Sequence, residues 1–202
     1  NTYKELISHF DGLEAFFIKG NHDDGCLWDR AFLRPEIAVN HFTHKDLKDL
    51  HFSCLPKKAI TNSKDEDGTY WYFDNKEKKV RFIGIDSSDN IQRVNDNGKL
   101  EYPGIGWAGI SDDQYEWLIK DALNFDEDGW TVMLFLHMIP NPADTDFEEK
   151  NKISQPLAII LDAYKRKEKI ERTFFKGKEM ETTINADFSK YKTAEIAAVV
   201  GG

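Results

Sequence analysis

The chain has 202 residues, of which 40% are hydrophobic and 13% aromatic, enough to bury a core and to exclude overall disorder. With 27 Lys and Arg against 36 Asp and Glu, the formal net charge is -9, which disfavours general binding to nucleic acid. No run approaches the roughly 20 apolar residues of a membrane helix, and two dispersed cysteines fit a reducing compartment, so we expect a soluble cytoplasmic protein.

The first predicted elements are a helix over residues 2–10 and a short buried strand over residues 15–18. Apolar residues at helical spacing favour the helix, and an unbroken apolar run favours the strand. A second helix is expected over residues 43–52, with Thr43 as its N-cap. Three histidines lie in or just before this helix, and we expect them on the surface: His41, His44 and His51.

A β-hairpin is predicted over residues 69–88, where aromatic and β-branched residues surround a polar turn at residues 75–78. Its second strand ends at Asp86. This carboxylate is either an ordinary turn residue or a group that supports a nearby site, and the sequence favours neither. The loop over residues 89–109 is too long for a passive connection in a compact domain, so we expect it to cover or shape a surface site.

The clearest helix is predicted over residues 111–123. Ser111 stands at its N-cap and Gln114 at the capping-box position, and an apolar stripe follows. The next strand, residues 130–140, is a continuous apolar run of the fully buried kind, with His137 toward its carboxyl end.

The last part of the chain is predicted to hold one helix and further β structure. The helix covers residues 156–170 and has Pro156 in its first turn. Residues 173–190 are expected to form a second hairpin or a loose β segment. A final strand is expected over residues 194–200, where an apolar run leads into two glycines.

Three predicted strands end in chemically similar ways. The first is followed by the sequence GNHD at residues 20–23, another ends at His137, and the last ends at Gly201. Because ligands gather at the carboxyl ends of strands in open α/β sheets, these groups predict one shared site. The amide of Asn21 and a histidine ring are competent ligands for Mn, Fe or Zn. The alternatives are an Asn-containing turn beside a surface imidazole, and a core histidine with one hydrogen bond.

The GNHD sequence resembles the third signature of the calcineurin-like metallophosphoesterases, a superfamily of two-metal hydrolases of phosphate esters. Later segments follow in that family's order: VRFIGIDSS, SDDQYEWLIKDAL, VMLFLHMIP and AEIAAVVGG. The order and spacing carry the match, which covers most of residues 1–202 and is weak over residues 28–68 and 141–190. Within the family, the chain looks most like bacterial or phage-encoded members.

The resemblance implies one domain over residues 1–202, an α/β sandwich in which two central β-sheets are flanked by helices. It also implies two divalent cations, Mn, Fe or Zn, with Asn21 and His137 as ligands of the same ion. His22 would face the scissile phosphate and either stabilise charge or protonate the leaving oxygen, and Asp23 would orient His22. The implied reaction is metal-dependent hydrolysis of a small phosphomonoester or phosphodiester.

The first, second and last signatures of the family are missing from the chain. We therefore expect it to be the central part of a longer protein, truncated at both ends, that binds metals weakly and is inactive alone. The alternative is a non-catalytic binding or structural module that keeps the fold without the metals, such as a component of a phage particle. A nuclease of the same superfamily ranks below a small-phosphoester hydrolase because of the acidic charge. Cys26 is expected to be a structural thiol, and Trp28 and Trp107 are expected in a substrate pocket or the core.

Overall fold

The computed structural model describes residues 5–6, 8–10, 14–24, 42–97, 100–103, 107–139 and 154–201. The strands are β1 (Ile60–Thr61), β2 (Trp71–Asn75), β3 (Val80–Gly84), β4 (Thr131–Phe135), β5 (Lys169–Phe174), β6 (Thr182–Asp187) and β7 (Glu195–Val200). The helices are α4 (His44–Phe52), α5 (Asp112–Trp117), its π-helical continuation η2 (Leu118–Ala122) and α6 (Ser154–Arg166). Within the described residues, no helix is long and apolar enough to cross a membrane.

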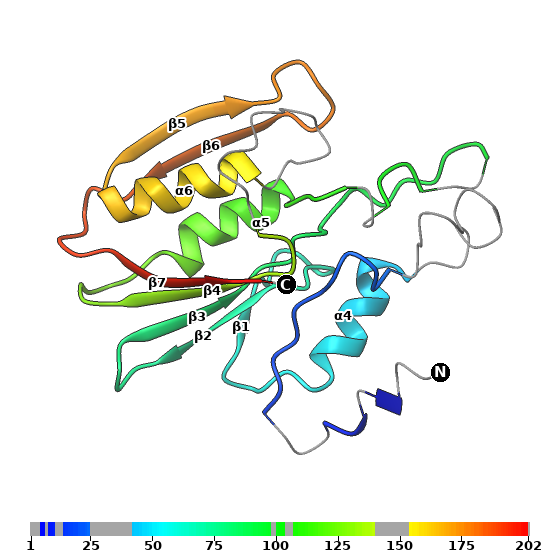
Figure 1. The fold of residues 1–202 in the computed structure, drawn as a ribbon, viewed down its shortest axis with the longest axis horizontal. Helices are drawn as coiled ribbons and strands as arrows, with labels where there is room; N and C mark the ends of the chain where they lie inside the picture. Colours follow the sequence, from blue (N-terminus) through cyan, green and yellow to red (C-terminus); the bar gives the residue numbers. More distant parts are fainter. Residues whose placement is uncertain are drawn as a thin grey trace.

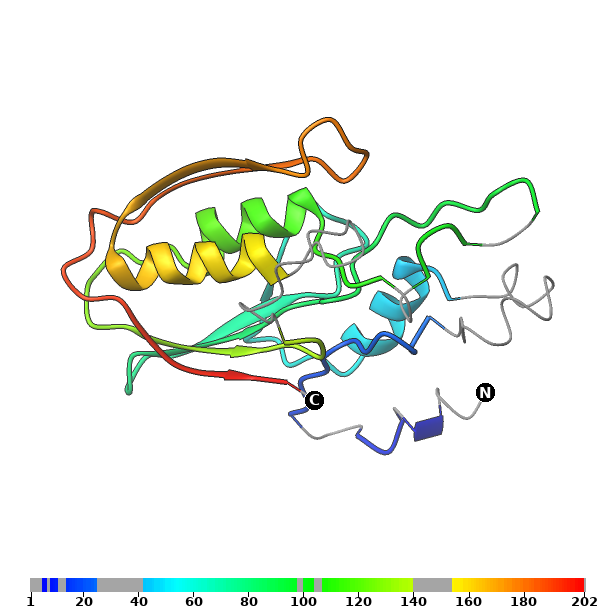
Figure 2. The same cartoon turned by 45° about the horizontal axis from the view of Figure 1, so that its top comes forward.

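These elements form a mixed α/β fold. One sheet has five strands in the order β1-β2-β3-β4-β7, and the β5-β6 hairpin forms a separate two-stranded sheet. Helices α5 and α6 cover one face of the five-stranded sheet, and the β5-β6 hairpin packs on the far side of these helices (Figure 1; Figure 2). The described part of the chain is therefore layered as sheet, helices and hairpin.

Strands β3, β4 and β7 run parallel, so their carboxyl ends meet at one edge of the sheet. Beyond the strands, the backbone N–H of Leu136 donates to the carbonyl of Val200 at 3.0 Å, and that of Ile85 to Phe135 at 2.8 Å. A Cβ on Gly201 would lie 2.6 Å from the Leu136 carbonyl oxygen. Only glycine fits this close approach, which brings the ends of β4 and β7 together.

The two faces of the sheet are covered differently. Ile83, Val132 and Leu134 are buried in one cluster with apolar side chains of the helices. On the other face the rings of Phe73 and Phe82 stack with their centres 4.7 Å apart, and Phe16 stacks on Phe73 at 4.4 Å. The segment that carries Phe16 therefore lies against the sheet face opposite the helices.

Several predicted elements are confirmed. The hairpin over residues 69–88 contains β2 and β3, and the helix over residues 43–52 is α4, capped by Thr43 as predicted. The helix over residues 111–123 is α5 with η2, and the Ser111 hydroxyl accepts a hydrogen bond from the Gln114 backbone as an N-cap does. The final strand is β7, and β4 lies within the predicted run at residues 130–140.

The predicted strand over residues 15–18 is wrong, because the structure assigns no strand to residues 14–20. This segment contacts the sheet through side chains instead of a backbone ladder. The Trp71 indole donates to the Phe17 carbonyl at 2.8 Å, and Phe16 packs on the aromatic face described above. Burial of an apolar run therefore does not require strand pairing here. Of the helix predicted over residues 2–10, Glu5, Leu6 and Ser8 are helical and the remainder falls mostly outside the described residues.

The helix predicted over residues 156–170 is too long at its carboxyl end. It stops at Arg166, and Lys167 has a φ of 61°, which a right-handed helix cannot continue. Lys169 already begins β5, so residues 169–187 contain the β5-β6 hairpin where the sequence predicted a hairpin or a loose β segment.

Candidate functional site

The side chains of Asn21 and His137 meet at the carboxyl edge of the sheet. His137 Nε2 lies 3.0 Å from Asn21 Oδ1, although the two residues are 116 positions apart in the chain. Gly20 lies beside this pair, since a Cβ there would be 3.7 Å from the His137 ring. The convergence that the sequence predicted for these two residues is therefore present in the structure.

The turn that carries Asn21 is closed by its own hydrogen bonds. The backbone N–H of Asp23 donates to the Gly20 carbonyl at 3.2 Å, and the Asp23 carboxylate accepts from the Gly20 backbone at 2.8 Å. The Asp23 carboxylate thus stabilises the turn, and the role that the resemblance implies for it, orienting His22, stays a prediction. His22 itself is exposed on the same turn, where a bound molecule could reach it.

His137 is held by the residues on both sides of it. The preceding residue, Leu136, donates to β7, as described above. The following residue, Met138, donates its backbone N–H to the Ser87 hydroxyl oxygen at 2.9 Å. Ser87 lies just beyond the carboxyl end of β3 and is completely buried. The turn after β4 is therefore anchored to the neighbouring strand ends.

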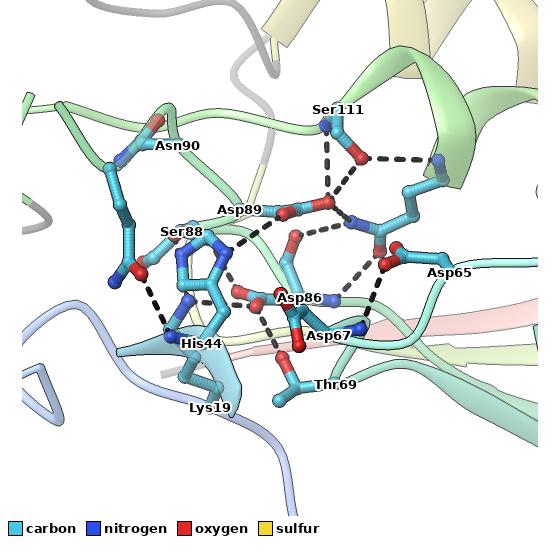
Figure 3. Close-up of polar contacts among 12 residues, drawn as sticks. Lys19, His44, Asp65, Asp67, Thr69, Asp86, Ser88, Asp89, Asn90 and Ser111 are labelled. Carbon is cyan, nitrogen blue, oxygen red and sulfur yellow. Dashed lines mark hydrogen bonds and ion pairs between the residues drawn. The ribbon is translucent and has the colours of Figure 1, made fainter. Parts of the chain in front are cut away.

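Asp86, the residue before Ser87, forms a buried ion pair with Lys19. The Lys19 ammonium donates to Asp86 Oδ2 and to the Ser88 carbonyl, both at 2.8 Å, and both charged side chains are 1% exposed (Figure 3). Asp86 Oδ1 accepts from the Ser88 backbone at 2.8 Å, and the Thr69 hydroxyl donates to Oδ2. Asp86 therefore contacts the segment that carries Asn21 through Lys19, and it also closes the turn after β3, so both roles that the sequence left open agree with these contacts.

Gln114 and Ser111 extend this network to a second buried carboxylate. The Gln114 side chain accepts from the Asp86 backbone N–H at 2.9 Å and donates to the Asp86 carbonyl at 3.0 Å and to Asp89 at 2.9 Å. The Ser111 hydroxyl also donates to Asp89 (Figure 3). The predicted capping-box role of the Gln114 side chain is therefore wrong. The Asp89 carboxylate accepts from the Ser111 backbone instead, at 3.3 Å.

Burial shifts the pKa values of this network in different directions. Burial raises the pKa of the Asp89 carboxyl to about 6, and the neighbouring charge of Asp86 adds to the increase. For Asp86, burial acts in the same sense, but the Lys19 ammonium and further interactions outweigh it and leave the pKa below its usual range. Burial lowers the pKa of the His44 imidazole to about 4, so its contact with Asp89 at 3.6 Å is not an ion pair at neutral pH.

The geometry of Asn21 and His137 fits a shared divalent cation. Two ligand atoms that bind one ion at right angles through bonds of about 2.1 Å lie about 3.0 Å apart. The observed separation of 3.0 Å agrees with this value and equally with a direct hydrogen bond. Among the described residues, no group of three or more His, Cys, Asp or Glu side chains is placed to hold a metal. The role of Asn21 and His137 as metal ligands stays a prediction.

The other histidine, cysteine and tryptophan residues noted in the sequence lie in different places. His41, Cys26 and Trp28 lie outside the described residues. The surface prediction is wrong for His51, which lies in the last turn of α4, is 1% exposed and stacks on Phe17. Trp107 is half-buried, with its ring 4.8 Å from that of Tyr102, and its expected place in a pocket stays a prediction.

Three residues of the site were not identified from the sequence. Lys19 is a single cation directly after an apolar run, and this position could have indicated a buried pairing. Gln114 is fully buried in a helix that otherwise buries apolar residues on that side, which is a weaker signal. Nothing in the sequence marks Ser87, because its partner is a backbone N–H 51 residues away.

Comparison of the chain with protein-family models, with curated proteins and with solved structures found no match. The fold and the site together define a mixed α/β protein in which an amide and an imidazole meet at the carboxyl edge of a parallel strand group, above a buried polar network.

Proposed function

We propose that this chain belongs to a metal-dependent hydrolase of phosphate esters, in which Asn21 and His137 ligate one divalent cation. The contact between Asn21 Oδ1 and His137 Nε2 carries the proposal. It joins the GNHD turn to the residue that the metallophosphoesterase resemblance pairs with it. Two central β-sheets flanked by helices, as the resemblance implies, are part of the same proposal; the described residues form one five-stranded and one two-stranded sheet.

The residues of the turn divide the work of the proposed reaction. When bound, two divalent cations would neutralise phosphate charge and supply hydroxide near neutral pH. Asn21 and His137 would hold one of the cations, together with ligands that the described residues do not supply. His22, exposed on the turn, contacts the phosphate and gives a proton to the leaving oxygen. Asp23 keeps the turn closed through Gly20, which fixes the direction in which His22 points.

The proposed substrate is a small phosphomonoester or phosphodiester. The charge of -9 supports this choice, because a nuclease would need a basic groove for its substrate. A reducing, cytoplasmic location is also part of the proposal.

The test is hydrolysis of p-nitrophenyl phosphate and bis-p-nitrophenyl phosphate with added MnCl₂, in protein expressed from the complete reading frame. We expect turnover that falls about 100-fold or more on His22→Ala, as for loss of a general acid. Substitution of the exposed His9 by Ala is the matched control and should leave the rate unchanged.

Absence of turnover by the wild type, or equal rates for His22→Ala and His9→Ala, would contradict the proposal. The alternative function, a non-catalytic binding or structural module, would then apply. Binding of Mn²⁺ without turnover would contradict the catalytic part of the proposal, because it would leave Asn21 and His137 as ligands without chemistry.

A further inference from the structure

The segment that follows β3 contacts both turns of the candidate site. Through its carboxylate, Asp86 holds Lys19, which lies two residues before Asn21. Through its hydroxyl, Ser87 holds the backbone of Met138, the residue directly after His137. Two consecutive buried side chains thus reach the two chain segments that supply Asn21 and His137.

The segment that follows β3 is itself held by hydrogen bonds to the backbone and the carboxylate of Asp86. The backbone of Asp86 is bound on both its N–H and its carbonyl by Gln114, which is fully buried in α5. The Asp86 carboxylate is bound by Thr69 and by the Ser88 backbone, in addition to Lys19. A buried group with this many partners has little freedom to move, so its position is transmitted to the groups that it holds.

We propose that the side chains of Asp86 and Ser87 are positioning residues that set the distance between Asn21 and His137. The inference deepens the proposed function, on which its consequence for metal binding rests. Asp86 acts on Asn21 through Lys19, and Ser87 acts on His137 through Met138. Neither residue touches a substrate or a cation. Their role is comparable to that of the groups behind metal ligands whose loss weakens metal affinity while the ligands themselves remain.

The neighbouring Ser88 offers a matched control for Ser87. Both serines are buried, at 0% and 3% exposure, and they are consecutive in the chain. The Ser87 hydroxyl accepts a hydrogen bond, whereas the Ser88 hydroxyl has no hydrogen-bond partner among the described residues. Substitution of either serine by Ala removes one buried oxygen from the same segment, but only Ser87→Ala releases the turn that carries His137.

The first measurement needs no metal. In protein labelled with ¹⁵N-histidine, the ring nitrogens of His137 are assigned by comparison with His137→Gln. If Asn21 Oδ1 accepts from the ring, the wild type holds the tautomer protonated at Nε2. We expect Ser87→Ala to shift these signals toward a mixture of tautomers and Ser88→Ala to leave them unchanged. Unchanged signals in Ser87→Ala, or equal shifts in both variants, would overturn the positioning role.

The second measurement is Mn²⁺ affinity, by titration calorimetry on protein from the complete reading frame. We expect Ser87→Ala to bind about tenfold more weakly than Ser88→Ala, and equal affinities would overturn the role in metal binding. If the wild type binds no Mn²⁺, the proposed function fails, and the ring signals still decide the positioning role. If Ser87→Ala does not fold, the same two measurements are made on the double variant Lys19→Met with Asp86→Asn. This variant tests the contact that positions Asn21.

Discussion

Two buried ion pairs lie at opposite ends of strand β3. Near its start, Arg81 pairs with Asp74, and just beyond its end, Lys19 pairs with Asp86. The side chains of the first pair are 8% and 15% exposed, and those of the second are both 1% exposed. The chemistry is similar, yet the two pairs join very different parts of the chain.

The Arg81 pair is local in the sheet. Arg81 and Asp74 are cross-strand neighbours in the β2-β3 hairpin, joined by two hydrogen bonds of 2.7 and 2.9 Å. The guanidinium also donates to carbonyls at the end of η2 and beyond, and lies between aromatic rings. Those contacts are with Asp121, Ala122, Asn124, Tyr72 and Phe125. This pair fastens a helix end to the sheet, far from the candidate site.

The Lys19 pair joins segments that are 67 residues apart and leads directly to the GNHD turn. The difference teaches that a buried ion pair can have two uses in one domain. One pair satisfies local backbone groups, and the other places a loop whose backbone forms no ladder with the sheet. Four predictions separate these uses, beginning with the largest effect.

Replacement of Lys19 by Met should cost about 3–5 kcal/mol in the free energy of unfolding, because it leaves the Asp86 carboxylate buried without its cation. Urea denaturation measures the loss. The control is Lys120→Met, since Lys120 forms an exposed i,i+4 pair with Glu116 and should change stability by less than about 0.5 kcal/mol. Equal effects of the two substitutions would mean that the Lys19 pair contributes no more to the free energy of unfolding than an exposed pair does.

Arg81→Met should cost about 3 kcal/mol, because Asp74 and the carbonyls at the end of η2 lose a buried partner. In contrast to Lys19→Met, it should leave the Mn²⁺ affinity of the complete protein unchanged. Denaturation and calorimetry on the same sample compare the two properties. A loss of affinity as large as that of Ser87→Ala would show that the two ends of β3 are not independent.

Asp89→Asn should make stability rise more steeply with pH between about 4 and 6. In this range folded Asp89, with its pKa raised to about 6 from 3.8, holds a proton that the unfolded chain has released, so its contribution falls as pH rises. Folded His44, with its pKa lowered to about 4 from 6.5, lacks a proton that the unfolded chain holds, so its contribution increases with pH.

The two contributions oppose each other in the wild type. Without the Asp89 carboxyl, only the contribution of His44 remains. The free energy of unfolding should then rise more steeply with pH, by at most about 1.4 kcal/mol per pH unit. Denaturation at several pH values measures the slope, and His44→Gln should change it in the opposite sense. A slope that is the same in all three proteins would contradict the assignment of these groups.

The double substitution Lys19→Met with Asp86→Asn should have the smallest effect on stability, about 1 kcal/mol, because no uncompensated charge remains buried. The Asn side chain can keep its hydrogen bonds with Thr69 and Ser88. Mn²⁺ affinity should nevertheless be lower than in the wild type, because the turn that carries Asn21 loses the contact between Lys19 and Asp86. Denaturation and calorimetry together test this separation, and recovery of both properties would indicate that charge burial alone explains Lys19.

Much of the fold could be predicted from local patterns. The β2-β3 hairpin, helix α5 with its Ser111 cap, and the positions of strands β4 and β7 follow from periodicity and turn residues. The segment over residues 15–18 was predicted as a strand because an apolar run has the same appearance whether it pairs with a neighbour or packs through its side chains. The end of α6 was missed because the positive φ of Lys167 has no signal in a residue type that favours helices.

The candidate site divides in the same way. Asn21 and His137 were predicted together from their residue chemistry and from the apolar runs before them, although the run before Asn21 forms no strand, whereas the role of Asp86 stayed open. Ser87 and Gln114 were missed because both act on backbone groups, which look alike at every position of a chain. Lys19 was missed because its partner Asp86 is 67 residues away in the chain, and no local pattern shows that the two segments are close in space.

The sequence by itself determined the α/β class, the order of most elements, and the choice of Asn21 and His137 as one pair. Only the tertiary structure decided that these groups lie 3.0 Å apart and that a buried network holds the turns that carry them. The physical reason is that periodicity records which face of an element is buried, whereas the partners of buried polar groups depend on contacts between segments far apart in the chain.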